Sequence, residues 1–327
     1  MLVEYQEKYQ RNWDDFVINH SINGTFFQTR RFLNYHPVDK FEDNSILFTK
    51  GNNIIAVIPA NVVKSDKQKH LISHMGSSYG GIVLGKQFNK IADVEMIFRE
   101  LDEYLSAQQF TYALFRQTSE IYEISNSKIL EYFFFYFGYN INYEMGYYGN
   151  LDHYSDDLSI NFNASRRRGL KNSQKNNLLF RELTTREDIS EFYNVLQNNM
   201  KKFHTTPGHS LEELFNLKNK ILKDDLKFYG VYYGHIMIAG SMVFCIERRV
   251  FLTHYLATRQ ESLSIHPSEF LYKELIEIAR KENFAKIAFG NCTFDLGKTL
   301  HKSLAQYKEG FGTEIYINRF FSKKYTL

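Results

Sequence analysis

The sequence predicts an α+β protein made of two copies of one unit, each with a mixed central sheet flanked by helices. Strand-like and helix-like runs follow the order hairpin, strand, helix, strand, helix, strand, and this order occurs again in the second half of the chain. The chain has 327 residues, more than the roughly 100 to 200 of an ordinary single domain. We therefore expect two domains, 1–155 and 156–327.

The first half is expected to begin its regular structure with a β-hairpin. Two β-rich runs within 44–63 flank Gly51, Asn52 and Asn53, which favour a tight turn. The Gly-rich stretch "MGSSYGG" at 75–81 predicts a loop between two short strands. The elements expected after the hairpin are a strand near Leu71, a strand at 82–84, a helix at about 91–108, a strand at 111–116, a helix near 120–137 and a strand near 139–150.

The second half repeats this order. Thr184 or Thr185 precedes a long amphipathic run with acids in its first turn, which predicts a capped helix. Pro267 stands where a further helix would begin, a position that tolerates proline. The expected elements are a strand at 177–183, helices at 186–203 and 210–222, a hairpin at 226–247, a strand at 249–258, a helix at 267–283, a strand at 286–290, a helix near 297–309 and a strand at 314–318.

Composition excludes a disordered chain and a general nucleic-acid binder. Hydrophobic residues make up 43% and aromatic residues 16% of the chain, which is typical of a globular protein. The formal net charge is only +3, whereas a nucleic-acid binder usually carries positive charge over a whole face. The stretch "RRRGLKNSQKNN" at 166–177 is therefore a local basic feature whose ligand the rest of the chain has to identify.

Several other classes are not supported by the residues. Cys245 and Cys292 have neither C-x-x-C spacing nor nearby His clusters, so we expect no disulfide scaffold and no metal site. The charged N-terminus is unlike an export signal, and the aromatic run at 131–143 is too short for a bilayer span. We expect a cytoplasmic protein in which that aromatic run belongs to the core, with membrane-surface association as the alternative.

Five segments, which together span nearly the whole chain, resemble the FemAB-like proteins. This family has two tandem acetyltransferase-like (GNAT-like) domains and includes bacterial aminoacyltransferases that extend peptidoglycan precursors. The resemblance implies a tandem GNAT-like fold and an acyl- or aminoacyltransferase activity. The segments are "NGTFFQTRRFLNYHP" (23–37), "SHMGSSYGGIV" (73–83), "NASRRRGLKNSQKNNLLFREL" (163–183), "NNMKKFHTTPGHSLEEL" (198–214) and "KIAFGNCTFDLGKTLHKSLAQYKEGFG" (286–312).

Two departures from related proteins leave the acyl donor open between aminoacyl-tRNA and acyl-CoA. GNAT proteins that use acyl-CoA carry a Gly-rich loop whose amides hold the pyrophosphate. The matching stretch here, "RQESLSIHPS" at 259–268, has no glycine, which counts against ordinary acetyl-CoA use at this site. Relatives that dock tRNA often insert a long coiled-coil arm, and 203–230 is too short to hold one.

Two residues are candidates for catalysis. Lys308 in "YKEGFG" matches a family lysine before the last strand, and the resemblance implies contact with a phosphate or an oxyanion. The alternative is a lysine favoured by the negative end of a helix. Asp295 in "NCTFDLGKTL" is a candidate base or substrate ligand, and its alternative is the N-cap of the following helix.

The basic stretch is a candidate phosphate site. Arg167, Lys171 and Lys175 fall at i, i+4, i+8 spacing, so a helix would place these like charges on one face. Arg also offers a two-pronged donor that matches a diphosphate. Three interpretations stay open: a solvated helix, a nucleotide-linked acceptor, or an RNA or tRNA donor. The candidate residues are Arg166, Arg167, Arg168 and Lys171.

Five further residues are candidates for substrate binding. Tyr79 in the Gly-rich loop could stack on a sugar or base, although a plain β-turn explains the glycines equally well. His204 and His209 flank "TTPG" between two helices and could line an acceptor cleft, or could simply be exposed. Ser268 and Glu269 begin the helix where a GNAT protein holds its donor, and helix capping is the alternative.

The expected activity is formation of an amide on an amino group of a nucleotide- or lipid-linked sugar or peptide, in bacterial cell-wall or surface-polysaccharide synthesis. One alternative keeps the fold but transfers an acyl group from acyl-CoA to an amino sugar. Another is a non-catalytic protein that recognises a glycan precursor. We expect no bound cofactor, no metal, no DNA partner and no transmembrane segment.

Overall fold

The computed structural model describes residues 1–327 except 38, 66–67, 203, 248 and 327. It divides into two compact units. The second unit ends inside the last strand, so the C-terminal residues belong to the first unit. The first unit comprises Met1–Glu144, Asp295–Lys298 and Ile317–Leu327, and the second comprises Met145–Phe294 and Thr299–Tyr316.

This division differs from the single boundary expected near residue 155. Two long strands, β9 (Asn140–Asn150) and β17 (Glu314–Lys324), have residues in both units. The C-terminal half of β17 pairs antiparallel with β8, from Phe320 opposite Arg116 to Lys324 opposite Tyr112. Pairing between residues so distant in sequence cannot be read from local periodicity.

The first unit contains two sheets. One has the order β1-β3-β4-β7, and the other includes the series β17-β8-β6-β5-β2, in which β6 and β8 are parallel. The strands are β1 (Leu2–Glu4), β2 (Glu42–Asp43), β3 (Ile46–Lys50), β4 (Asn53–Ile58), β5 (Asn61–Ser65), β6 (Gln68–Ser73), β7 (Val83–Leu84) and β8 (Tyr112–Arg116), and the helices are α1 (Gln10–Asp15), α2 (Arg30–Leu33), α3 (Ile91–Ala107) and α4 (Lys128–Tyr136).

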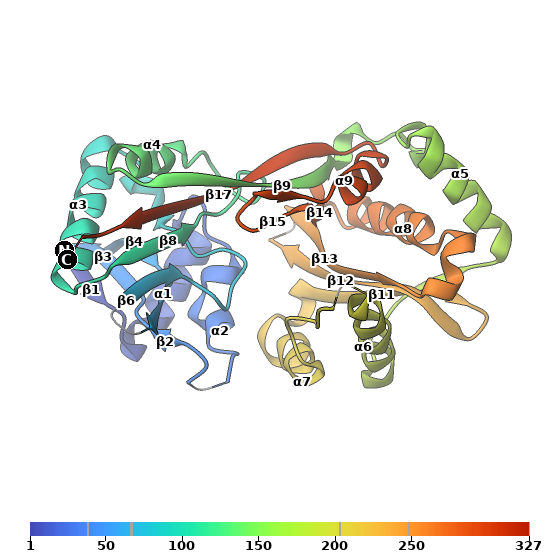
Figure 1. Ribbon diagram of the computed structural model, residues 1–327, viewed down its shortest axis with the longest axis horizontal. Coiled ribbons are helices and arrows are strands. Elements are labelled where there is room, and N and C mark those ends of the chain that lie inside the picture. The colour runs from blue at the N-terminus through green and yellow to red at the C-terminus, as the bar shows by residue number, and fades with distance from the viewer. Residues whose placement is uncertain (38, 66–67, 203, 248, 327) are drawn as a thin grey trace. The chain divides into compact units, whose positions relative to one another are not determined.

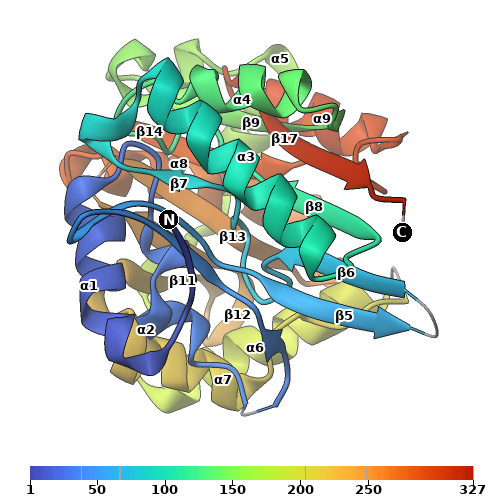
Figure 2. The same ribbon diagram turned by 90° about the vertical axis from the view of Figure 1, so that its left-hand side faces the viewer.

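Helices α3 and α4 bury their apolar faces on the strands of this unit, as Figure 2 shows for α3. In α3, apolar residues recur at helical spacing and are buried with Phe133 and Phe134 of α4. The aromatic run of α4 is therefore only partly core, because Tyr132, Phe135 and Tyr136 are exposed. Helix α4 also begins at Lys128, later than the expected 120, since Glu123 binds the backbone N–H and hydroxyl of Ser127 in the preceding turn.

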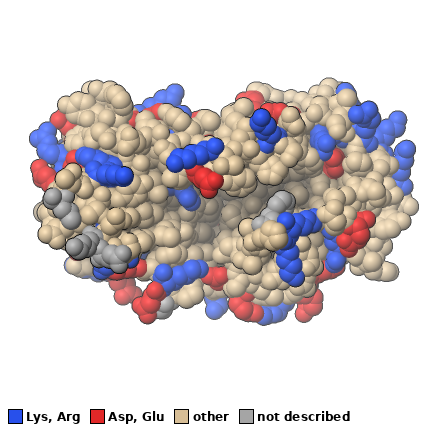
Figure 3. Space-filling model, viewed as in Figure 1, with Lys and Arg blue, Asp and Glu red and all other residues tan. Residues whose placement is uncertain are grey.

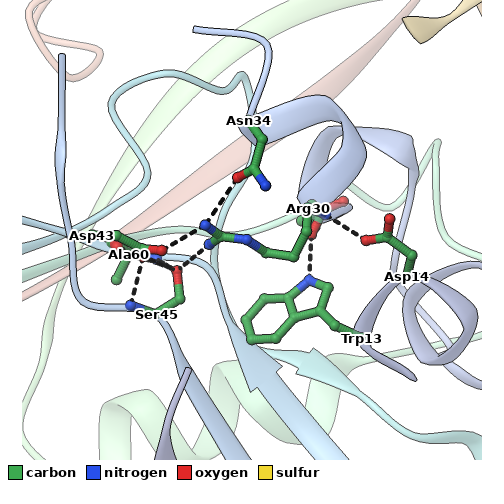
Figure 4. Close-up of polar contacts among 8 residues, drawn as sticks. Trp13, Asp14, Arg30, Asn34, Asp43, Ser45 and Ala60 are labelled. Atoms are coloured by element: carbon green, nitrogen blue, oxygen red, sulfur yellow. Dashed lines mark hydrogen bonds and ion pairs between the residues drawn. The ribbon is translucent and has the colours of Figure 1, made fainter. Parts of the chain in front are cut away.

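A buried arginine ties the N-terminal segments of the first unit together (Figure 4). The Arg30 guanidinium forms an ion pair with Asp43 and donates to Ser45 Oγ and to Asn34 Oδ1. It also lies 4.0 Å from the ring centre of Tyr5. Paired charge and hydrogen bonds offset the cost of removing the guanidinium from water.

The second unit is built on a strongly apolar sheet. Its series is β10-β11-β12-β13-β14-β9, and every strand pair is antiparallel except β13 with β14. The central strand β12 is almost wholly buried, which explains its continuous apolar sequence. The strands are β10 (Leu179–Glu182), β11 (Leu226–Tyr233), β12 (Ile236–Ile246), β13 (Val250–Thr258), β14 (Lys286–Asn291), β15 (Thr293–Phe294) and β16 (Thr299–Leu300).

Helices cover both faces of this sheet (Figures 1 and 2). α8 and α9 share one core with the strands, and α6 packs against β12 and β13 on the opposite face, where α7 also lies. Thr185 caps α6 as expected, and Pro267 is the first residue of α8. The helices are α5 (Ala164–Ser173), α6 (Arg186–Lys201), α7 (Leu211–Asn216), α8 (Pro267–Lys281) and α9 (Lys302–Glu309).

We predict that Arg30→Ala lowers the free energy of unfolding by about 3 kcal/mol, because it leaves Asp43 and Ser45 without their partner. Urea unfolding measures the change. Arg31→Ala is the matched control, since the Arg31 side chain is exposed, and it should change stability by less than about 0.5 kcal/mol. Equal effects of the two substitutions would contradict the assignment.

Candidate functional site

The candidate site lies where two parallel strands of the second unit separate. Residues Val250–Leu252 of β13 pair with Lys286–Ala288 of β14. Within the described part of both strands the pairing goes no further, although β13 continues to Thr258. Thr253 Oγ1 donates to Ala288 O (2.9 Å) at the point of separation. We call the space beyond this bond the strand gap.

A β-bulge in β14 shapes the edge of the strand gap. The register of β14 against β9 shifts between Ala288 and Gly290, and Gly290 has φ +74°, a conformation that favours glycine. The position that a Cβ would take on Gly290 lies 3.9 Å from both Lys308 Nζ and Thr253 O. The bulge thus brings backbone oxygens and the Lys308 ammonium group together at the gap.

Lys308 is the most unusual charged residue at this site. It is the penultimate residue of α9 and only 5% exposed. Its Nζ donates to Gly290 O (2.8 Å) and to Asn291 O (2.6 Å), which uses two of the three N–H groups of an ammonium ion. Burial lowers the pKa of Lys308 to about 8, and nearby Cys292 opposes this shift. A buried ammonium held by two carbonyls can stabilise negative charge that develops at the gap.

Arg166 is directed into the protein and away from solvent. Its guanidinium forms an ion pair with Glu269, which is 5% exposed, and lies 4.4 Å from the ring centre of Tyr307. Asn163 N donates to Gly310 O, which fastens the start of α5 to the end of α9. Arg166 therefore positions the helix that carries Lys308, and we find no support for the expectation that it contacts substrate directly.

The start of α8 is also occupied by side chains of the protein. Ser268 was a candidate for substrate binding, with helix capping as the alternative. It does not cap the helix, because the N-cap is His266, and Ser268 Oγ bonds Thr258 Oγ1 (2.9 Å). Pro267 supplies no N–H, and the Glu269 carboxylate lies within the first turn. These residues do not fit the pyrophosphate of a coenzyme A, which needs free amides and no competing anion.

The remaining basic residues of α5 face outwards. Arg167, Arg168 and Lys171 are exposed, and among the described residues they form no ion pair. They line a groove of about 630 Å³ whose other charged residues are Lys273 and three acids, Asp156, Asp157 and Glu277. Figure 3 shows Lys and Arg side chains gathered over α5. This exposed basic face is the part of "RRRGLKNSQKNN" that can meet an anion.

Tyr79, another predicted residue, lies in the core. Tyr79 is 6% exposed and packs on Phe27 and Tyr122, so it cannot stack on a ligand, contrary to expectation. The amides of Gly80 and Gly81 are used by Arg116 O and Ser73 Oγ, which makes the Gly-rich loop structural.

The candidate residues in loops differ in their exposure and in their contacts with other side chains. His204 is exposed, whereas His209 Nδ1 lies 3.0 Å from Tyr255 Oη. Asp295 is exposed in the turn between β15 and β16. It is not the N-cap of the following helix, because α9 begins later, at Lys302, and His301 caps it through a bond to Leu304 N.

Solved structures identify the fold. No protein-family model and no curated protein matches the sequence. The crystal structure of FemX is similar, with a TM-score of 0.71, 12% identity and coverage of 98% of this chain and 96% of that one. The chain has a FemAB-like tandem GNAT fold.

Two other structures share this fold. The L-PGS structure from Bacillus licheniformis has a TM-score of 0.61 at 9% identity and covers 99% of this chain and 94% of that one. A tandem GNAT protein from the clavulanic acid biosynthesis pathway has a TM-score of 0.57 at 9% identity, covering 99% and 98%. At such identities the likeness concerns the fold alone.

The structure also adds residues that the sequence interpretation missed. Thr253 and Gly290 shape the strand gap, and His254 and Tyr255 follow directly on β13. A histidine and a tyrosine inside the apolar run "FLTHYLAT" were the available signal. Among the described residues, no group of His, Cys, Asp and Glu is suited to a metal ion, and no helix is long and apolar enough to cross a membrane.

We predict a proton-linked gain in stability from Lys308. Its folded pKa is about 8 and its usual value 10.5, so between these pH values the unfolded chain binds more protons and the free energy of unfolding rises with pH. Relative to Lys308→Met, the wild type should gain roughly 2 to 3 kcal/mol across this range. Urea unfolding at several pH values measures the difference, and a constant difference would contradict the lowered pKa.

Proposed function

We propose that this protein is an acyl- or aminoacyltransferase that forms an amide on an amino group of a nucleotide- or lipid-linked sugar or peptide, in cell-wall or surface-polysaccharide synthesis. The observation that carries the proposal is the buried Lys308 ammonium at the strand gap, fixed by Gly290 O and Asn291 O. The fold shared with FemX, and with a structure named as a lysylphosphatidylglycerol synthetase domain, supports it.

The reaction needs little chemistry from the protein itself. The amino nitrogen attacks the acyl carbonyl carbon, the N–C bond forms, and the carbonyl oxygen becomes negative in the tetrahedral intermediate. The Lys308 ammonium stabilises that oxygen when it approaches the strand gap. The bond from the acyl carbon to its carrier oxygen then breaks, and the proton lost by nitrogen is balanced by the proton gained by the carrier oxygen.

We propose a donor other than acyl-CoA, and aminoacyl-tRNA is the donor class we favour. The ion pair of Arg166 with Glu269 and the proline at the start of α8 support this choice, because they leave no anion site for the coenzyme pyrophosphate. The exposed basic face of α5 would then contact phosphate groups of a substrate.

We predict that Lys308→Met lowers kcat by about 100-fold or more, because removing one oxyanion donor typically costs that much. The measurement is amide formation with purified aminoacyl-tRNA or acetyl-CoA as donor and nucleotide-linked amino sugars or peptides as acceptor. Lys302→Met, at the exposed start of α9, is the control. Unchanged turnover in Lys308→Met would remove Lys308 from the mechanism, and transfer from acetyl-CoA would contradict the donor assignment.

We predict that replacing Arg167, Arg168 and Lys171 together by Ser weakens binding of the phosphate-bearing substrate by about tenfold or more while thermal stability is unchanged. Filter binding at several salt concentrations makes the measurement. A steep decline with salt indicates tRNA, and a shallow one a compact diphosphate. Lys201→Ser, at the exposed end of α6, is the matched control. Wild-type affinity in the triple variant would show that the basic face is only solvated.

A further inference from the structure

A second bulge of the same unit lies next to the strand gap. Met242 pairs with Tyr255 and Val243 with Thr253, so His254 is an extra residue in β13 with no partner position on β12. A bulge re-aims side chains and often lies beside an active site. The pairing of β13 with β14 ends at the bond from Thr253 to Ala288 O, so the bulge begins where the strand gap begins.

The bulge brings two consecutive side chains toward the same loop. His254 and Tyr255 would point to opposite faces of a regular strand, yet both rings lie 5.9 Å from the ring centre of His209. The Tyr255 hydroxyl accepts from Gly208 N (3.1 Å) and lies 3.0 Å from His209 Nδ1. The loop before α7 is thus fastened to β13 by polar contacts on the α6 and α7 face of the sheet (Figure 1).

Aromatic side chains surround this cluster. Phe244 of β12 lies 5.0 Å from the His254 ring, and Tyr193 of α6 donates to His209 O. Burial raises the pKa of Tyr255, and the carboxylate of Glu213 in α7 adds a smaller contribution in the same direction. Burial, with a smaller contribution from His209, lowers the pKa of His254 to about 3, so this imidazole is uncharged at neutral pH. An uncharged imidazole presents one hydrogen-bond acceptor and one donor.

We propose that His254, Tyr255 and His209 form the subsite for the acceptor's primary amino group, with His254 as a positioning residue that accepts a hydrogen bond from the uncharged amine. This inference rests on the proposed amide-forming function and names the part of the acceptor that the strand gap receives. Burial beside these aromatic rings favours the neutral amine over its ammonium form, and only the neutral form has the lone pair that attacks.

The position of the cluster explains how the amine would meet the acyl group. Lys308 reaches the strand gap from α9, which shares its core with α8, whereas His209 precedes α7 on the opposite face. An amine held by His254 therefore approaches the acyl carbon from one face while the ammonium contacts the oxygen from the other. The amine nitrogen forms the new bond, and its surplus proton is balanced by protonation of the carrier oxygen.

The first test measures binding without turnover. Calorimetry with glucosamine and with Nα-acetyl-lysine at about pH 9, where a larger share of each amine is uncharged, should show saturable binding to the wild type. N-Acetylglucosamine, whose amine is blocked, should bind at least about tenfold more weakly. His254→Phe keeps an aromatic ring but loses the hydrogen-bond acceptor, and it should weaken binding of both amines by about tenfold. His235→Phe, on an exposed hairpin turn, is the matched control.

The second test uses turnover and separates this inference from the proposed function. His254→Phe should lower kcat/KM for the acceptor by about 10- to 100-fold and leave KM for the donor unchanged, and His254→Gln should restore part of the loss. Absence of amide formation by the wild type would overturn the proposed function. The calorimetric measurement of amine binding would still test the subsite. The inference is overturned if neither amine binds, or if His254→Phe binds both amines and uses the acceptor like the wild type.

Discussion

The buried ammonium group of Lys308 accounts for the irregular backbone of β13 and β14 in the second unit. Inside a regular sheet the carbonyl oxygens are used by neighbouring strands, so a buried lysine finds no partner there. Lys308 finds two, because the bulge at Gly290 and the separation of β13 from β14 release oxygens at one point. The positive φ of Gly290, the bond from Thr253 to Ala288 and the place of α9 are consistent with this requirement.

The parallel strand pair of the first unit is completed by a loop instead of a buried lysine. β6 and β8 are paired as far as Ser73 and Phe115. Beyond that point the Gly-rich loop supplies the missing partners, since Gly80 N donates to Arg116 O and Gly81 N to Ser73 Oγ. A Cβ on Gly80 would come within 2.6 Å of the Ser73 and His74 backbone, so the close approach needs glycine. The same strand arrangement thus carries a structural loop in one unit and a buried lysine in the other.

The basic stretch has two functions that its composition does not separate. Arg166 forms an ion pair with Glu269 and a cation–π contact with Tyr307, and it thereby holds α5 against α9. The outward residues Arg167, Arg168 and Lys171 remain for an anion. The same short helix therefore carries both an internal ion pair and an external charged face, because neighbouring residues of a helix point in different directions. The proposed donor and acceptor contacts follow from that division.

The sequence by itself determined the α+β class, the repeated order of elements and the helix that begins at Pro267. Each of these depends on local periodicity or on a short motif, which single residues and their neighbours carry. Only the tertiary structure decided that Tyr79 is core, that Arg166 faces inwards and that His254 sits in a bulge beside the strand gap. Those features depend on partners far away in the chain; Glu269, the partner of Arg166, lies 103 residues later. No local sequence pattern specifies which distant residue will contact a given side chain.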